Sequence, residues 1–150
     1  MKDIFNQTIT SEFIDRINSL NPTSQPKWGK MSVEKMLAHC NVAYEMAFEN
    51  MHQKPNAFKK FFIKLLVKNY IVNDIPFKKN VHTAPDFIIK SEKNFDIEKK
   101  RLIDYIIKTQ QLGAAYFEGK ESHSFGPLTK HEWNNMFSKH LDHHLNQFGV

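Results

Sequence analysis

Three histidines lie within five residues near the end of the chain, at His140, His143 and His144. The surrounding residues are typical of a helix that faces a protein core, where an imidazole needs a polar partner. On a helix with about 100° between successive residues, His140 and His144 share one face, and His143 lies about 60–100° to the side. Two histidines four residues apart can reach a single metal ion. The spacing therefore favours a pair of metal ligands at His140 and His144.

A pair of structural histidines, hydrogen-bonded to carboxylates, would give the same pattern and stays open as an alternative. Metal is favoured because this helix face has few other polar groups that could satisfy two buried rings. The H-E-x-x-H signature of helical zinc proteases is absent, since Leu141 follows His140. The sequence thus predicts a metal site without the chemistry of that protease class.

A third ligand has to come from another helix, and His39 is the best candidate because it lies in a segment with helical spacing of apolar residues. Cys40 is rotated by about 100° from His39, so we expect it to be a small buried thiol. The remaining histidines fall in loops, at a helix end, or about 13 Å of helix rise from His140. They are His52, His82, His123 and His131.

Three further residues could support such a site from behind the ligands. Gln147 lies one turn beyond His144 and could hydrogen-bond a ligand ring or a water, with a solvent-facing amide as the equal alternative. Tyr44, five residues after His39, could line the same cavity or pack in the core. His143 is the third candidate, from its place beside the inward face.

Three neutral imidazoles leave at least one coordination position for water or substrate, which is the pattern of catalytic metal sites. An ion there could activate water or stabilise a thiolate, so hydrolysis and thiol transfer are both open. Ligation by nitrogen alone suits zinc, nickel, copper or iron and does not choose among them. The site chemistry therefore predicts a divalent metal and leaves the reaction open.

The chain as a whole reads as a single all-α domain over residues 1–150, because glycine is scarce and helix-favouring residues dominate. Gly113 is expected to end one helix, and residues 22–30, 74–85 and 114–128 to form connections. Residues 56–72 are expected to form a packed helix with a solvated lysine edge. The helices predicted from apolar spacing and capping residues run from Thr10 or Ser11 to about Leu20, from Ser32 to about Asn50, over 56–72, over 91–111, and from the capping box Thr129–Glu132 to the end.

Composition narrows the class of partner. The net charge of +5 could suit nucleic acid, but the basic residues are lysines apart from Arg16 and Arg101, which disfavours base recognition. No stretch approaches the roughly 18 apolar residues of a membrane span, and the first residues do not resemble a secretory signal. One cysteine excludes an intrachain disulfide, so we expect a cytoplasmic protein.

Three stretches of the chain together resemble a known family. They are Trp28-Gly29-Lys30-Met31-Ser32 leading to Met36-Leu37-Ala38-His39, then Phe125-Gly126-Pro127-Leu128-Thr129 with Trp133, and finally Lys139-His140-Leu141-Asp142-His143-His144-Leu145-Asn146-Gln147-Phe148-Gly149-Val150. In their order they resemble the DinB/YfiT-like superfamily of metal-dependent four-helix-bundle proteins, and within it the branch catalogued as domain of unknown function 1569.

The resemblance implies a four-helix bundle with an additional short helix, in which His39, His140 and His144 bind nickel or zinc. Its wider superfamily includes thiol-dependent S-transferases and a maleylpyruvate isomerase. Leu145 stands where those enzymes have an arginine, so the resemblance does not establish their substrate contacts for this chain.

We therefore expect a metal-dependent transferase or hydrolase that acts on a small molecule, with a low-molecular-weight thiol as a candidate co-substrate and a homodimer left open. The rival is a non-catalytic sensor or stress-related module that binds a metal or a small ligand. A weaker third reading is a lysine-rich surface that binds a membrane or nucleic acid.

Overall fold

The computed structural model describes residues 1–49 and 51–150 of the chain. Within them, helices dominate and the one sheet is a two-stranded hairpin, so the prediction of an all-α fold is confirmed. The elements are α1 (Gln7–Asn18), α2 (Val33–Phe48), α3 (Ala57–Leu66), α4 (Lys68–Val72), the 3₁₀ turn η1 (Pro85–Phe87), α5 (Phe95–Phe117), β1 (Glu121–Ser122), β2 (Gly126–Pro127) and α6 (Lys130–Phe148).

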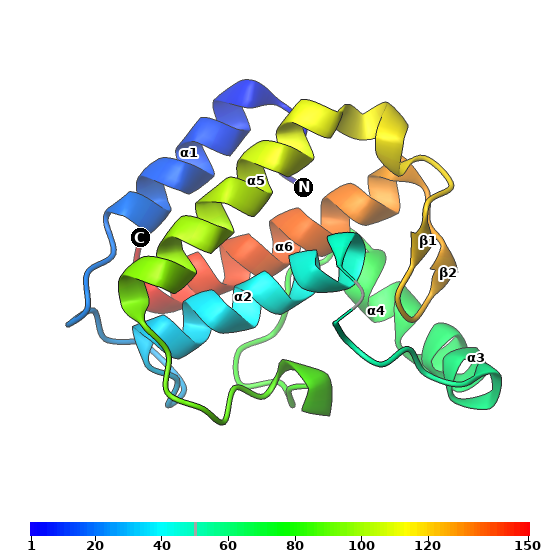
Figure 1. Cartoon of the computed structure of the whole chain (residues 1–150), viewed down its shortest axis with the longest axis horizontal. Helices are drawn as coiled ribbons and strands as arrows, with labels where there is room; N and C mark the ends of the chain where they lie inside the picture. Colours follow the sequence, from blue (N-terminus) through cyan, green and yellow to red (C-terminus); the bar gives the residue numbers. More distant parts are fainter. Residues whose placement is uncertain (50) are drawn as a thin grey trace.

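Four long helices, α1, α2, α5 and α6, pack side by side as a bundle (Figure 1). Helix α6 contacts the other three and also α4, so it has neighbours on several sides. Its apolar residues Trp133, Phe137, Leu141 and Leu145 are almost fully buried, as expected for a helix at the centre of a bundle. The histidine pair therefore lies on a helix that other helices surround on several sides.

Aromatic rings fill much of the core beside α6. The ring of Tyr44 stacks on Phe137 at 4.6 Å between centroids and on Tyr105 at 5.7 Å. Phe117 packs against both Phe137 and Trp133. Because these rings come from α2, α5 and α6, they fix the three helices relative to one another.

The first helix begins earlier than its sequence suggests. Its N-cap is Asn6, whose side chain accepts from the backbone N–H groups of Thr8 and Ile9, and the helix ends at Asn18 rather than Leu20. The predicted caps Thr10 and Ser11 are therefore wrong. Thr10 is buried inside the helix, where its hydroxyl donates to the carbonyl of Ile4 at 2.8 Å.

The second and last helices begin where capping residues predict. Ser32 is the N-cap of α2, and Thr129 with Glu132 forms the expected capping box of α6. Helix α2 ends at Phe48; the predicted end near Asn50 lies outside the described residues.

Helix α5 differs from its prediction at both ends. It begins at Phe95, after the N-cap Asn94, rather than near Ser91. Gly113 interrupts it with φ 72°, but a further helical turn continues to Phe117. The predicted loop over 114–128 is therefore wrong at its start, and it also holds the antiparallel hairpin of β1 and β2.

The segment 56–72 is not one packed helix. A break at Val67 separates α3 from α4, and α3 contains no buried residue. The expectation that its apolar residues pack on the body of the protein is contradicted. Within the described residues, no helix is long and apolar enough to cross a lipid bilayer.

Candidate metal centre

The structure brings His39, His140 and His144 together. His39 comes from α2, and the other two lie one turn apart on α6, as their spacing requires. The ring centroids are 4.8 Å apart for His39 and His140, 4.5 Å for His39 and His144, and 4.9 Å for His140 and His144. One nitrogen from each ring lies within 4.8 Å of the others, close enough for a shared ion.

Two of the rings are oriented by hydrogen bonds on the side away from the cluster. The Nδ1 of His39 lies 2.9 Å from the backbone carbonyl of Phe87, and the Nδ1 of His144 lies 2.8 Å from Oε1 of Gln147. Since both partners are carbonyl oxygens, each Nδ1 must donate, which leaves Nε2 of a neutral ring with a free lone pair. Partners of this kind fix the tautomer of metal-binding histidines.

The third ring, His140, turns its Nε2 to within 2.8 Å of Nε2 of His39. If Nε2 of His39 is an acceptor, a metal-free protein keeps a proton on Nε2 of His140 and forms a hydrogen bond there. An ion at this point would displace that proton, because metal binds the unprotonated nitrogen. The cluster thus has one exchangeable proton at the place where the three rings meet.

Gln147 is buried and held from its other end by the loop before α2. Its Nε2 donates to the carbonyl of Trp28 at 2.8 Å, while its own backbone carbonyl accepts from the N–H of Lys27 at 2.7 Å. Gly29 has φ +78°, and a Cβ at this position would lie 2.8 Å from Nε2 of Gln147. The tryptophan-glycine turn therefore sets the position of the amide that orients His144.

Burial keeps the cluster neutral. Desolvation lowers the pKa of His39, lowers that of His140 far below its usual value, and lowers that of His144 to about 3. For His140 and His144 the neighbouring imidazoles oppose a second positive charge and lower the pKa further. Neutral rings are the form that binds a metal. At neutral pH the site therefore has to lose only the proton shared between His140 and His39 before it binds an ion.

Phe87 covers one side of the cluster. Its ring lies edge-on to both His39 and His140, at 5.4 Å and 5.7 Å between centroids. His39 and His144 are only 4% and 8% exposed. The 3₁₀ turn η1 therefore supplies both a hydrogen-bond acceptor and a hydrophobic cover.

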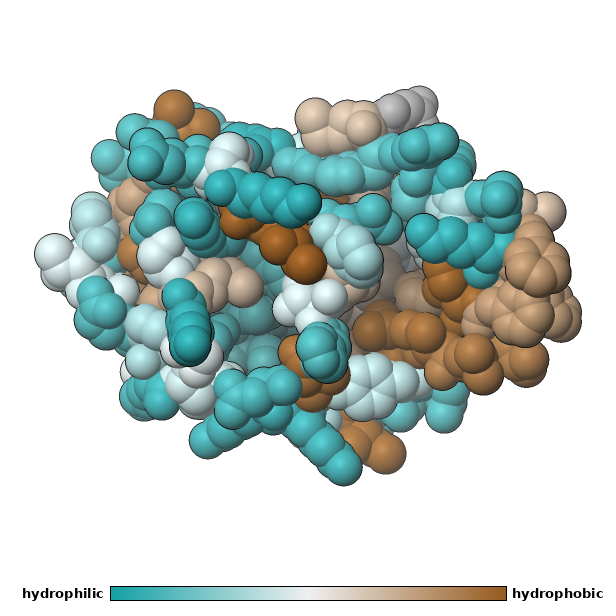
Figure 2. All heavy atoms as spheres, turned by 90° about the horizontal axis from the view of Figure 1, so that it is seen from below, coloured by the Kyte–Doolittle hydropathy of each residue, from teal (hydrophilic) through white to brown (hydrophobic). Residues whose placement is uncertain are grey.

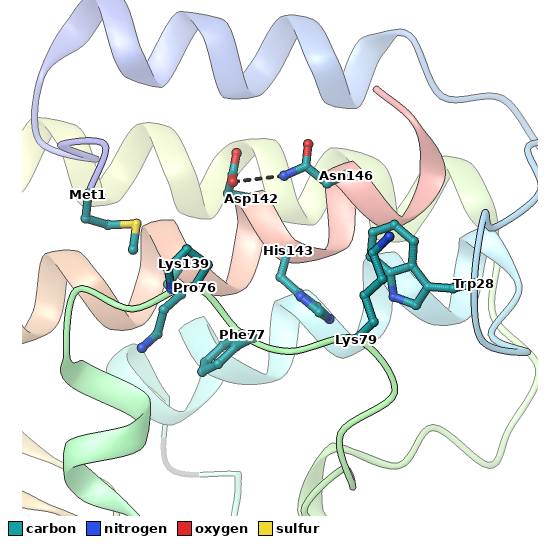
Figure 3. A pocket seen from close by; sticks show the side chains of 9 residues that line it. All are labelled: Met1, Trp28, Pro76, Phe77, Lys79, Lys139, Asp142, His143 and Asn146. Atoms are coloured by element: carbon teal, nitrogen blue, oxygen red, sulfur yellow. Dashed lines mark hydrogen bonds between the residues drawn. The ribbon is translucent and has the colours of Figure 1, made fainter.

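His143 does not join the cluster. Its half-buried ring lies edge-on to Trp28 and to Phe77, and it forms part of the wall of a cavity of about 180 Å³ (Figure 3). Burial lowers the pKa of His143, against a backbone hydrogen bond with Phe77 and the charge of Asp142. Its ring also contacts the ring of His144, at 5.0 Å between centroids, so this wall of the cavity touches the cluster.

The other candidate residues lie elsewhere. Tyr44 belongs to the aromatic core described above, and Cys40 is buried with its thiol against the sulfur of Met36. Three of the remaining histidines make their own contacts, His52 with Glu45, His131 with Asp74 and His123 with Ser124, and His82 is exposed.

Sequence reasoning missed two contributors. The carbonyl of Phe87 left no signal, because any residue supplies a backbone carbonyl. Lys139 was not foreseen as buried, yet its ammonium donates to the carbonyls of Tyr70 and Asn73 and to Oδ1 of Asn73. Lys139 therefore ties Tyr70 and Asn73, which precede the segment that lines the cavity, to α6.

Fold and site together define a helical-bundle protein with a three-histidine cluster that could hold a metal ion. A family model described as protein of unknown function (DUF1569) matches residues 5–149, nearly the whole chain, and the protein belongs to that family. No curated protein and no solved structure gave a significant match.

Proposed function

We propose that this protein is a metal-dependent enzyme in which His39, His140 and His144 hold one divalent ion. The observation that carries the proposal is the convergence of three neutral imidazoles from two helices, two of them buried and oriented from behind by Phe87 and Gln147. Purely structural histidines would gain little from such convergence, because each ring would be better satisfied by a partner of its own.

The donor set fits a transition metal that prefers nitrogen. Nickel or zinc is our first expectation, and iron or copper suits the same ligands. When bound, the ion would supply a Lewis acid with at least one position open to a small molecule. This arrangement of ligands also supports our proposal that the family belongs to the DinB/YfiT-like superfamily.

The chain's own residues provide a place for a substrate beside the cluster. The cavity of Figure 3 has aromatic walls at Trp28 and Phe77, and the ammonium of Lys79 lies 4.4 Å from the centre of the Trp28 ring. Neutral His143 faces this cavity, where it can accept a proton from a thiol or a water. A cavity of this size suits a small molecule.

The reaction we propose is thiol-dependent S-transfer or hydrolysis of a small electrophile. A low-molecular-weight thiol is the proposed co-substrate, which agrees with a cytoplasmic location, and a homodimer is compatible with this chemistry. The second candidate is a non-catalytic sensor of metal or ligand. It is favoured by one observation, the cover of Phe87 over His39 and His140.

Metal analysis of protein purified without a histidine tag tests the site. We expect one ion per chain, lost in His39→Ala, His140→Ala and His144→Ala and kept in the matched control His143→Ala. Full retention of metal in the His39 or His144 variant would contradict the proposed ligand set.

Turnover separates the enzyme from the sensor. Metal-loaded protein is incubated with a small electrophile, such as an activated aryl halide or an ester, with and without thiol. We expect conversion that needs the metal and falls in His143→Ala although the metal is kept. Metal binding without conversion across such a panel would favour the sensor.

A further inference from the structure

Helix α3 exposes its apolar side chains to solvent, unlike a helix that packs on the body of a protein. None of its residues is buried, and Phe58 and Leu66 are 75% and 73% exposed. The half-buried positions facing the body are Lys60 and Ile63. Apolar side chains gather at the end of the molecule that carries α3 (Figure 2). The exposed apolar residues of α3 are Phe58, Phe61, Phe62, Leu65 and Leu66, and together we call them the α3 face.

Helical geometry makes the α3 face continuous. With about 100° between residues, its five members fall within an arc of about 140°. Lys59 borders this arc on one edge, and Lys64 lies near the other, about 60° away. Both lysines are exposed. An exposed apolar stripe of this width is typical of a surface that binds another protein or a membrane.

The charge around the α3 face indicates what kind of surface covers it. Residues 51–73 contain five lysines and no acidic residue. The whole chain has 21 basic and 16 acidic residues, so the remaining residues carry 16 of each and the entire net charge of +5 resides in this segment. Lys60 and Lys68 are paired with Glu121 and Glu132, which fasten α3 and α4 to the hairpin and to α6. The surface that complements the α3 face is therefore apolar within and negatively charged at its border.

We propose that the α3 face docks this protein reversibly onto an anionic lipid bilayer. Phenylalanine and leucine enter the boundary between headgroups and acyl chains, while the bordering lysines contact phosphate and carboxylate groups of the lipids. A second copy of the chain fits this face less well, because two such faces would bring their lysine borders together. The proposal is independent of the metal centre, since no histidine of the cluster lies on α3.

Vesicle sedimentation tests the proposal with the full chain. The probes are vesicles of phosphatidylcholine alone and of phosphatidylcholine mixed with phosphatidylserine. We expect binding to the mixed vesicles that weakens as salt rises, and much weaker binding to the neutral ones. Two double variants should each reduce the fraction bound by about tenfold or more. One is Phe58→Ser with Leu65→Ser, and the other is Lys59→Glu with Lys64→Glu. These side chains are exposed, so the variants should keep the circular dichroism spectrum of the fold.

Matched controls carry equal changes elsewhere. Ile97→Ser with Ile107→Ser removes two exposed apolar residues from α5, and Lys30→Glu with Lys90→Glu changes the net charge by the same amount as the lysine variant. Both should bind as the parent does. In Phe61→Trp, the emission of the introduced tryptophan should shift to the blue with mixed vesicles only. Such a shift would report insertion directly.

Two results would overturn the proposal. One is equal binding of the parent and the α3 variants to mixed vesicles. The other is absence of vesicle binding together with a concentration-dependent dimer that Phe58→Ser with Leu65→Ser dissociates, which would make the α3 face a contact between copies.

Discussion

The imidazole of His144 is a buried base that the native fold keeps uncharged. Its pKa is about 3, against 6.5 for an ordinary histidine, because burial and then the charge of His39 oppose protonation. As pH falls below about 6.5, the unfolded chain takes up a proton that the native metal-free protein refuses. The free energy of unfolding should therefore fall by up to about 1.4 kcal/mol per pH unit for this residue, down to the native pKa.

Urea unfolding of chelator-treated protein across this pH range measures the effect. In His144→Leu the dependence on pH should be shallower, because one neutral imidazole has been removed. Unchanged slopes in parent and variant would show that His144 titrates alike in the folded and unfolded states.

Gln147 acts through His144. In Gln147→Leu the Nδ1 of His144 loses its acceptor, and the ring is free to change tautomer and orientation. We expect metal affinity, measured by competition with a chromophoric chelator, to fall about 10- to 100-fold. The neighbouring exposed Asn146→Ala should have little effect. Equal affinities in the parent and Gln147→Leu would make this amide a packing residue only.

The elements show why part of the site could be read from sequence. The pair His140 and His144 depends on one helix, whose start is fixed by Thr129 and Glu132. His39 follows Ser32, a second recognisable cap, so its helix was also predictable. By contrast, the acceptor for His39 is a backbone carbonyl in η1, within a connection that has no periodic pattern.

Local signals also failed where one pattern fits more than one arrangement. Thr10 looks like a helix cap but is buried and donates to Ile4. In α3 the periodicity of apolar residues is real, yet periodicity cannot say whether the apolar stripe faces the protein or the solvent. That choice depends on which neighbouring surfaces are available in the assembled bundle.

The turn before α2 provides a test of how a loop controls the site. Gly29→Ala places a side chain at φ +78° and pushes a Cβ toward Nε2 of Gln147. Gly119→Ala is the matched control, because its φ is +71° but no atom lies within 4 Å of its added Cβ. Both should lose about 1–2 kcal/mol of unfolding free energy from backbone strain.

Metal affinity separates the two glycine variants. Gly29→Ala alone should lower it, since only that change displaces the amide that orients His144. Similar affinities in Gly29→Ala and Gly119→Ala would mean that the turn does not position Gln147 for binding.

Across the whole molecule, α6 connects two regions of different character. Its first turn is tied to α4 through Lys68 and Glu132, next to the exposed and positively charged α3. Its last turns carry the histidines, enclosed by α2 and η1. A surface contact at α3 can therefore hold the protein in place without involving the histidine cluster.

Because His39 and the pair on α6 come from different parts of the chain, an ion bound to all three binds the native state and has no preformed site in the unfolded chain. At a free metal concentration 100 times the Kd, this adds about 2.7 kcal/mol to the free energy of unfolding. For a domain of this length the midpoint of thermal unfolding should rise by about 5–10 °C. The increment should vanish in His39→Ala and persist in His82→Ala, which changes an exposed histidine. Calorimetry with nickel or zinc measures it, and an equal rise in both variants would mean that the ion binds outside the cluster.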